Sequence, residues 1–208
     1  MNIVFDFGAV LFGWQPAQLL QQVFGARAGD SVQDARQMAH QIFGHPDWHA
    51  FDQGLLDADA VVQRVAERLA LPLPAVHELV HGIGERLRPL DDTVALLQGL
   101  CQRRSAGQGV HALYYLSNMP VPYARLLEQR HAFVHWFDGG LFSGDVRLIK
   151  PDPAIYLLLQ QRYLLPPAQT LFIDDLKANV HAAQALGWHG IHFESAAQLQ
   201  AELQQFAL

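Results

Sequence analysis

The sequence has almost no cysteine, no basic segment and no long apolar run. Cys101 is the only cysteine among 208 residues, so no disulfide can form within the chain and a reducing compartment is expected. Lysine and arginine number 14 against 20 acidic residues and do not cluster, which argues against a nucleic-acid or acidic-membrane partner. No apolar run approaches the length of a membrane-crossing helix, and the first residues lack a secretory pattern. We therefore expect a soluble, cytoplasmic protein.

Hydrophobic residues, by contrast, are abundant. They make up 50% of the chain and charged residues only 16%, so a sizeable core can form. A chain of this length suits one domain, or one domain that carries a modest insertion. We expect a monomer or a homodimer.

Short apolar segments alternate with helical patterns at the start of the chain and throughout its second half. Each apolar segment is bounded by Gly, Pro, Asn or Asp, which is typical of strands. The predicted strands are 3–7, 110–117, 141–143, 170–174 and 190–193, and the predicted helices between and after them are 121–130, 153–163, 176–186 and 196–206. This alternation predicts an α/β fold with a Rossmann-like parallel sheet flanked by helices.

The region from residue 14 to residue 88 contains helical patterns only. They cover 16–24, 31–42, 58–69 and 74–87, with breaks at glycine and proline between them. The simplest arrangement is an all-helical cap inserted directly after the first strand, above the carboxyl ends of the strands. The predicted domains are a core at 1–13 and 89–208 and a cap at 14–88.

Polar side chains gather where the predicted strands end. They are Asp6, Ser117, Asn118, Asp174 and Asp175, together with Lys150 just before a predicted helix. The carboxyl ends of parallel strands meet at one end of the sheet, so these groups should lie close together. Three carboxylates in one cleft repel each other unless a cation lies among them, and Mg²⁺ prefers such oxygen ligands. A lysine and a serine beside them suit the oxygens of a phosphate group.

Four segments resemble, in order, the motifs of the haloacid dehalogenase superfamily: FDFGAVL, LSN, LIKPDPAIY and FIDDLKANV. The spacings of 111 residues from Asp6 to Ser117, 33 to Lys150 and 24 to Asp174 suit members with a helical cap after the first motif. The likeness extends over nearly the whole chain and is closest to a branch that includes sugar-1-phosphate phosphatases. It implies a phosphatase acting on a small phosphorylated metabolite, possibly a sugar phosphate, with Mg²⁺ as cofactor.

The resemblance also implies a role for each motif residue. Asp6 would be the nucleophile that becomes an aspartyl-phosphate, and Lys150 would hold both Asp6 and the transferring group. Phosphate oxygens would be bound by Ser117 and Asn118. The Mg²⁺ ligands would be Asp6, the backbone carbonyl of Gly8, Asp174 and Asp175.

Gly8 departs from the family pattern. Phosphatases of this family usually have an aspartate there that protonates the leaving group, and such a group contributes about 10²–10⁴ in rate. True dehalogenases also lack this aspartate, but they bind no metal and have no acidic pair like Asp174–Asp175, so the pair favours phosphate. Two alternatives stay open: a 2-haloacid dehalogenase with Asp6 as nucleophile, and a catalytically impaired phosphate-binding or interaction protein. If another residue supplies the proton, His45, His49 and Asp52 are the first candidates.

A substrate pocket is expected above Asp6. Trp14 follows the first motif, and the segment HPDWHAFDQG lies inside the predicted cap. Trp48 and Phe51 would form walls, while His45, His49 or Asp52 would bind substrate hydroxyls. The alternative for the two aromatic residues is packing within the cap itself.

Overall fold

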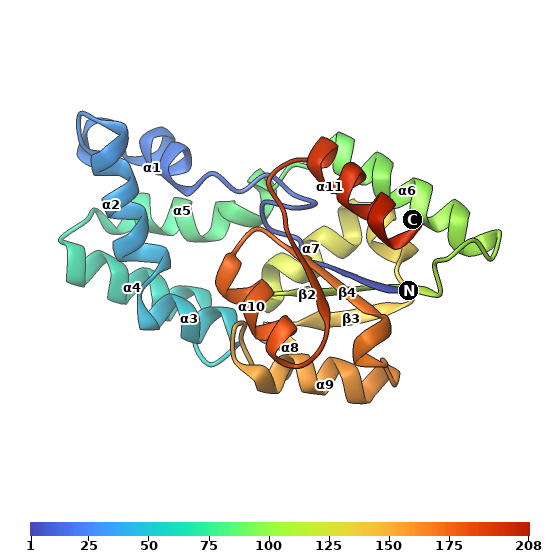
Figure 1. Cartoon of the computed structure of the whole chain (residues 1–208). Helices are drawn as coiled ribbons and strands as arrows, with labels where there is room; N and C mark the ends of the chain where they lie inside the picture. Colours follow the sequence, from blue (N-terminus) through green and yellow to red (C-terminus); the bar gives the residue numbers. More distant parts are fainter.

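A five-stranded parallel sheet forms the centre of the protein. The computed structural model describes residues 1–208, and the strands lie in the order β3-β2-β1-β4-β5 with every neighbouring pair parallel (Figure 1). Their bounds are β1 (Asn2–Phe5), β2 (Ala112–Ser117), β3 (Gly139–Phe142), β4 (Thr170–Asp174) and β5 (His189–His192). The predicted α/β fold is therefore confirmed. Because β1 is the middle strand, the residues that follow it lie at the centre of the sheet's carboxyl end.

Helices cover both faces of this sheet. Side chains alternate along β1, so that Ile3 and Phe5 pack into a larger apolar cluster while Val4 packs into a smaller one on the opposite face. The helices that contribute to the larger cluster are α6 (Asp91–Ser105), α7 (Val121–Arg130) and α11 (Ala196–Leu203). The smaller cluster contains side chains from α9 (Pro153–Tyr163) and α10 (Lys177–Ala185). Figure 1 shows α6 and α9 on opposite sides of the strands.

Five further helices follow β1 and lie beyond one end of the sheet (Figure 1). They are α1 (Pro16–Phe24), α2 (Val32–Phe43), α3 (Pro46–Asp52), α4 (Ala58–Leu69) and α5 (Leu73–Arg86). We call residues 14–88 the cap and the remainder the core. The chain enters and leaves the cap along paired segments, because Gly13 N–H donates to the Arg88 carbonyl and Leu90 N–H donates to the Leu11 carbonyl, both at 2.8 Å. The larger apolar cluster continues from the core into the cap without a break.

Helix α3 was not among the predicted helices. Its segment begins after Gly44 and contains Pro46, which indicated a break, but Pro46 occupies the first turn, where a missing N–H costs nothing. His45 caps the helix, since its Nδ1 accepts a hydrogen bond from Asp47 N–H at 3.1 Å. This short helix contacts α8 (Ser143–Val146) of the core.

No helix of the protein combines the length and the apolar character that crossing a bilayer requires.

Candidate active site

A cavity of about 470 Å³ lies between the core and the cap, at the carboxyl ends of β1, β2 and β4. Most of the predicted site residues line it. From the core these are Asp6, Gly8, Ser117, Asn118, Lys150 and Asp175, and from the cap they are Trp14, Trp48, His49 and Asp52. The sheet topology thus brings together residues that are up to 169 positions apart in the sequence, from Asp6 to Asp175.

Asp6 sits at the floor of this cavity, just beyond the end of the central strand. Only 7% of the residue is exposed. Its Oδ1 accepts a hydrogen bond from Phe7 N–H at 2.6 Å and lies 2.9 Å from Lys150 Nζ, whereas its Oδ2 has no donor from the protein. Burial raises the pKa of Asp6 to about 7, with Lys150 opposing the rise and Asp174 and Asp175 adding to it. Oδ2 is therefore the oxygen free to act as a nucleophile.

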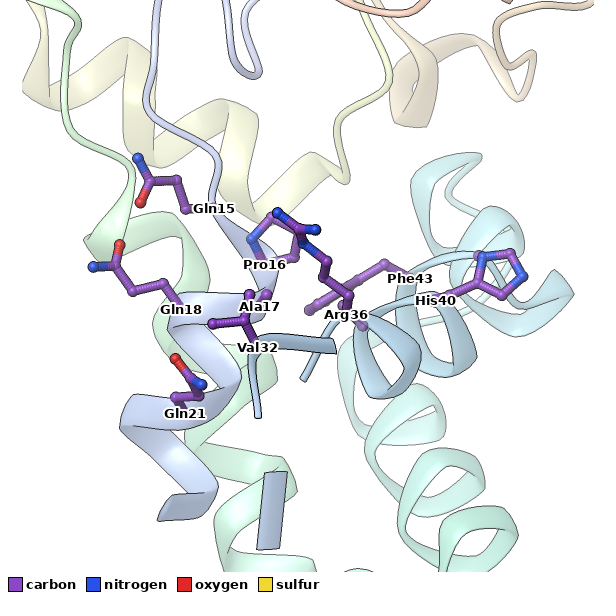
Figure 2. A pocket seen from close by; sticks show the side chains of 11 residues that line it. Gln15, Pro16, Ala17, Gln18, Gln21, Val32, Arg36, His40 and Phe43 are labelled. Carbon is purple, nitrogen blue, oxygen red and sulfur yellow. The ribbon is translucent and has the colours of Figure 1, made fainter. Parts of the chain in front are cut away.

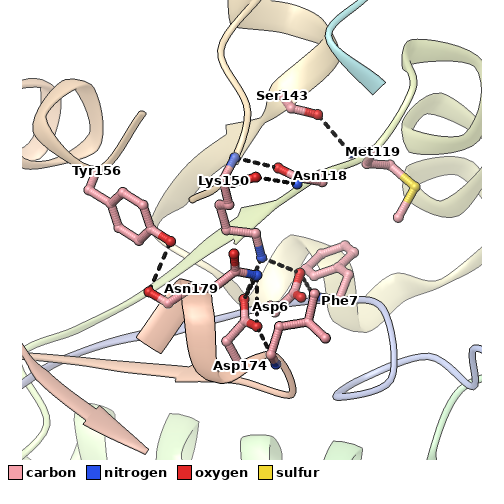
Figure 3. A network of polar contacts seen from close by, with 10 residues as sticks. Asp6, Phe7, Asn118, Met119, Ser143, Lys150, Tyr156, Asp174 and Asn179 are labelled. Atoms are coloured by element: carbon pink, nitrogen blue, oxygen red, sulfur yellow. Dashed lines mark hydrogen bonds and ion pairs between the residues drawn. The ribbon is translucent and has the colours of Figure 1, made fainter. Parts of the chain in front are cut away.

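Lys150 joins two buried carboxylates (Figure 3). Its Nζ lies 2.6 Å from Asp174 Oδ2 in addition to its contact with Asp6, and the lysine is only 3% exposed. Burial alone would lower the pKa of Lys150, but the two carboxylates together raise it. The ammonium group is therefore charged and held beside Oδ1 of Asp6, where it can offset the negative charge of a transferring phosphoryl group.

The carboxylate of Asp174 is already occupied by hydrogen bonds. Besides Lys150, it accepts from the backbone N–H of Leu176 at 2.8 Å and from Asn179 Nδ2 at 2.9 and 3.0 Å (Figure 3). Asp174 is fully buried and does not line the cavity. The neighbouring Asp175 does line it.

The three acidic residues have the spacing of a divalent-cation site. Carboxylate oxygens of Asp6, Asp174 and Asp175 lie within 4.8 Å of one another. Burial, followed by the field of Asp174, raises the pKa of Asp175 to about 6. Lys150 supplies one positive charge against three negative ones, so the cluster retains an excess of negative charge. These oxygens, with the backbone carbonyl of Gly8 at the cavity wall, are a donor set that fits Mg²⁺.

Ser117 and Asn118 differ from each other in their hydrogen bonding. Ser117 Oγ is the one buried side-chain oxygen or nitrogen of the protein without a hydrogen-bond partner, and the residue lines the cavity. An unpaired buried hydroxyl facing a cavity suits an oxygen of a bound ligand. The amide of Asn118 instead pairs with the backbone of Lys150, accepting from its N–H at 2.8 Å and donating to its carbonyl at 3.0 Å. The backbone N–H of Asn118 and the second N–H of its Nδ2 are left for the predicted phosphate contact.

The predicted substrate residues fall into two groups. Trp14, Trp48 and His49 line the cavity, whereas His45 and Phe51 do not. His45 is committed to the start of α3, and the Phe51 ring packs edge-on against Trp48 at 5.5 Å between ring centres. The expectation that His45 and Phe51 line the pocket therefore needs correction: one is a helix cap and the other is part of the cap's packing.

Several lining residues could not be found from motifs. Ile83 and Leu87 come from the end of the cap, and Met119 and Tyr123 come from the core just after β2. Ile83, Leu87 and Tyr123 belong to apolar helical patterns that predict burial and nothing more, and Met119 lies between a predicted strand and a predicted helix. No sequence signal distinguishes a buried side chain that faces a cavity from one that faces a neighbouring helix.

A second hollow, of about 720 Å³, lies on the cap between α1 and α2 (Figure 2). Arg36 and His40 are its only ionisable residues, and its remaining wall is made of Gln, Ala, Pro, Val, Phe and Gly side chains. It holds no carboxylate, hydroxyl or thiol that could act as a nucleophile. The smaller cavity above Asp6 is therefore the candidate active site.

Comparison with known proteins identifies the family of the chain. A sequence model of the haloacid dehalogenase-like hydrolases matches residues 3–187. The chain belongs to that family. It is accordingly an enzyme, a hydrolase whose relatives include phosphatases.

Two relatives are similar over most of their length. The sesquiterpene phosphatase astK of Aspergillus oryzae is 30% identical over 202 residues, which cover 97% of this chain and 94% of that protein. The enolase-phosphatase E1 of Methylococcus capsulatus is 29% identical over 194 residues, covering 86% of this chain and 77% of that protein.

Solved structures share the fold at lower identity. The family enzyme bt-2542 of Bacteroides thetaiotaomicron, in complex with magnesium and inorganic phosphate, has a TM-score of 0.69 at 18% identity, covering 95% of this chain and 98% of that one. The L-2-haloacid dehalogenase of Xanthobacter autotrophicus has a TM-score of 0.65 at 19% identity, covering 97% and 81%. The fold alone therefore does not separate phosphate from halide chemistry.

Proposed function

We propose that the protein is a Mg²⁺-dependent phosphatase that hydrolyses a small organic phosphate through an aspartyl-phosphate on Asp6. The observation that carries this proposal is the group of three carboxylates within 4.8 Å of one another, next to a nucleophilic oxygen of Asp6 and the unpaired hydroxyl of Ser117. A cation site beside an anion site suits a phosphate ester. Displacement of halide needs no such acidic group, so the dehalogenase alternative is less well supported. The names of the two similar phosphatases and of the structure with magnesium and phosphate point the same way.

The residues suggest a division of labour. Oδ2 of Asp6 attacks phosphorus, while Lys150 and the hydroxyl of Ser117 stabilise the charge on the phosphoryl oxygens. Water then attacks the aspartyl-phosphate and releases inorganic phosphate and free Asp6. Asp6, Asp175 and the carbonyl of Gly8, with Asp174 as a supporting carboxylate, would hold Mg²⁺, which would supply positive charge beside the phosphate.

The wall above Asp6 favours an apolar leaving group. Trp14, Phe43 and Trp48 face the cavity from one part of the cap, and Ile83 and Leu87 face it from the end of α5 and the residue that follows. A sugar phosphate, the substrate class expected from the sequence, would find only His49 and Asp52 of the cap as partners for its hydroxyl groups. Burying unpaired hydroxyls is unfavourable, so we propose that compact apolar or aromatic monophosphates are preferred over sugar phosphates. A relative named as a sesquiterpene phosphatase supports this choice.

A phosphate-release assay over a panel of monophosphates tests the proposal. The panel should contain aryl, isoprenoid and sugar phosphates, each measured with Mg²⁺ and with EDTA. We expect release that requires Mg²⁺ and that Asp6→Asn abolishes, together with a beryllium fluoride adduct on Asp6 in the wild type. A parallel incubation with 2-chloropropionate should release no halide.

Halide release that Asp6→Asn stops would establish the dehalogenase alternative instead. Absence of both activities, with inorganic phosphate still binding, would identify a catalytically impaired phosphate-binding protein.

A further inference from the structure

The position that usually carries the acid of this site has no side chain. Gly8 lines the cavity, and a Cβ atom built on it would meet no atom within 4 Å. The space beside the leaving group is thus open on the core side. A proton for the leaving oxygen has to come from another wall of the cavity.

We propose that Asp52 of the cap is the general acid and base of the reaction, in the role that Gly8 cannot perform. This inference rests on the proposed phosphatase function. Asp52 is the last residue of α3, and it lines the same cavity as Asp6 from the opposite side of the core–cap boundary.

The backbone around Asp52 is fixed against the core. Ser143 Oγ donates a hydrogen bond to the Asp52 carbonyl and accepts one from Met119 N–H, two residues after Ser117. Gly54 packs so closely on Gly144 that a Cβ there would lie 2.5 Å from the Gly144 carbonyl oxygen. The position of Asp52 is therefore tied to the loop that carries the phosphate-binding serine, as a proton donor requires.

The carboxyl group of Asp52 is not used by the protein. It makes no hydrogen bond or ion pair with another side chain or backbone group, whereas the carboxylates of Asp6 and Asp174 do. Burial raises the pKa of Asp52 to about 8, opposed by Lys150 across the cavity. Tyr123, His49, Asp6 and Asp175 are the other ionisable groups that face this space. A carboxyl group that keeps its proton at neutral pH can donate it, and can recover it from water afterwards.

The other proton donors near the cavity are less suitable. His45 lies outside it, and His49 is exposed to solvent. The hydroxyl of Tyr123 donates to the Val80 carbonyl, and burial raises its pKa well above the usual value. Asp175 belongs to the acidic cluster beside Asp6. Asp52 remains: its carboxyl group has no hydrogen-bond partner in the protein, and its backbone is hydrogen-bonded to Ser143 of the core.

The proton balance closes over the two steps. As Oδ2 of Asp6 bonds to phosphorus, the bond from phosphorus to the leaving oxygen breaks, and that oxygen takes the bonding electrons and the proton of Asp52. The alcohol departs and Asp52 is left as a carboxylate. In the second step Asp52 takes a proton from the water that attacks phosphorus, the bond to Asp6 breaks, and phosphate is released with Asp52 protonated again.

The test is the dependence of kcat/KM on the pKa of the leaving group. A series of aryl and alkyl phosphates should be measured with the wild type, with Asp52→Asn, and with Asp30→Asn as a control that removes an exposed carboxylate of the cap outside the cavity. We expect Asp52→Asn to lose about 10²–10⁴-fold on alkyl phosphates and little on p-nitrophenyl phosphate, whose leaving group needs no proton. The basic limb of the wild-type pH profile, near the pKa of about 8, should disappear. Asp30→Asn should keep the wild-type slope.

A rescue variant separates catalysis from folding. Gly8→Asp combined with Asp52→Asn should recover activity on alkyl phosphates, because it returns a carboxyl group to the cavity. If Asp52→Asn does not fold, Asp52→Ser takes its place in the series. Equal losses on aryl and alkyl phosphates, or an unchanged slope, would overturn the assignment of Asp52 while leaving the phosphatase function intact. A wild-type enzyme that releases phosphate from no monoester would instead refute the proposed function itself.

Discussion

Lys150 Nζ lies 2.6 Å from Asp174 Oδ2, and neither residue has appreciable contact with solvent. The same nitrogen contacts Asp6, so one ammonium group compensates two buried carboxylates. Removal of one partner from such a group leaves uncompensated charge in a medium of low polarity. The carboxylates of Asp6 and Asp174 therefore depend on the same side chain for charge compensation.

Lys150→Met should lower the free energy of unfolding by about 3–5 kcal/mol and abolish phosphate release. Urea denaturation with and without Mg²⁺ measures the first effect. Lys177→Met is the matched control, because Lys177 is the chain's other lysine and is exposed on the first turn of α10. Loss of stability in the control as large as in Lys150→Met would contradict this account.

Asp174→Asn and Asp175→Asn should have different effects. The oxygens of Asp174 are engaged by Lys150, Asn179 and the Leu176 N–H, so its replacement should chiefly lower the thermal midpoint. Asp175 faces the cavity with fewer such bonds, so its replacement should weaken Mg²⁺ binding about 10-fold or more and leave the fold intact. Calorimetric titration of Mg²⁺ and thermal melts measure the two effects. The reverse pattern would make Asp174 the principal ligand.

The stability of the protein should fall with rising pH through the titration of Asp52. The pKa of this group is raised from 3.8 to about 8 on folding, so the folded state binds the proton more tightly than the unfolded chain. This contribution to stability is complete below about pH 4 and is lost as the pH rises to about 8. Asp52→Asn does not titrate, so its thermal midpoint relative to the wild type should rise over that range and then level off. Asp30→Asn, at an exposed position, should follow the wild type at every pH.

Alanine substitutions at Trp48 and Phe51 should distinguish a role in substrate binding from a role in packing. Both are buried, and replacing either with alanine should cost about 3–5 kcal/mol of stability. Only Trp48 lines the cavity, so only Trp48→Ala should change the ratio of kcat/KM between aryl and sugar phosphates. If Phe51→Ala shifts this ratio equally, the effect arises from repacking of the cap and not from contact with substrate.

Gly8→Asp alone should fold normally. The backbone of Gly8 is not in the left-handed region, unlike that of the following Ala9 at φ 56°, and the space for a side chain is open. We expect an unfolding free energy within about 1 kcal/mol of the wild type. The gain on alkyl phosphates should be far below the roughly 10²–10⁴ of a new acid, because Asp52 already supplies the proton. A full gain would mean that the wild type has no acid.

The sheet and the residues at its carboxyl end could be predicted from the sequence. Alternation of short apolar segments with helices requires a parallel sheet, and such a sheet places Asp6, Ser117 and Asp175 at one end whatever the details of packing. The order of the motifs along the chain then suffices to indicate the chemistry.

The cap could be predicted only as a set of helices. Pro46 predicts a break between helices but begins α3, and His45, a predicted pocket residue, caps that helix. The contact of Ser143 with the Asp52 carbonyl joins residues 91 positions apart, and no local pattern encodes it. The pairing of Asn118 with Lys150 is equally non-local. Long-range contacts between turns thus set the details of the site.

The paired segments at Gly13–Arg88 and Leu11–Leu90 have a consequence for the architecture of the enzyme. The two ends of the cap lie side by side, because the chain leaves and rejoins the core at one place. A different insert whose ends have similar spacing could replace the cap without altering the connectivity of the sheet. The proposed nucleophile Asp6 and its partner Lys150 would remain, because both belong to the core. The proposed proton donor Asp52 and the cap residues that line the cavity belong to the insert. Replacing the cap would therefore change substrate specificity and acid catalysis together.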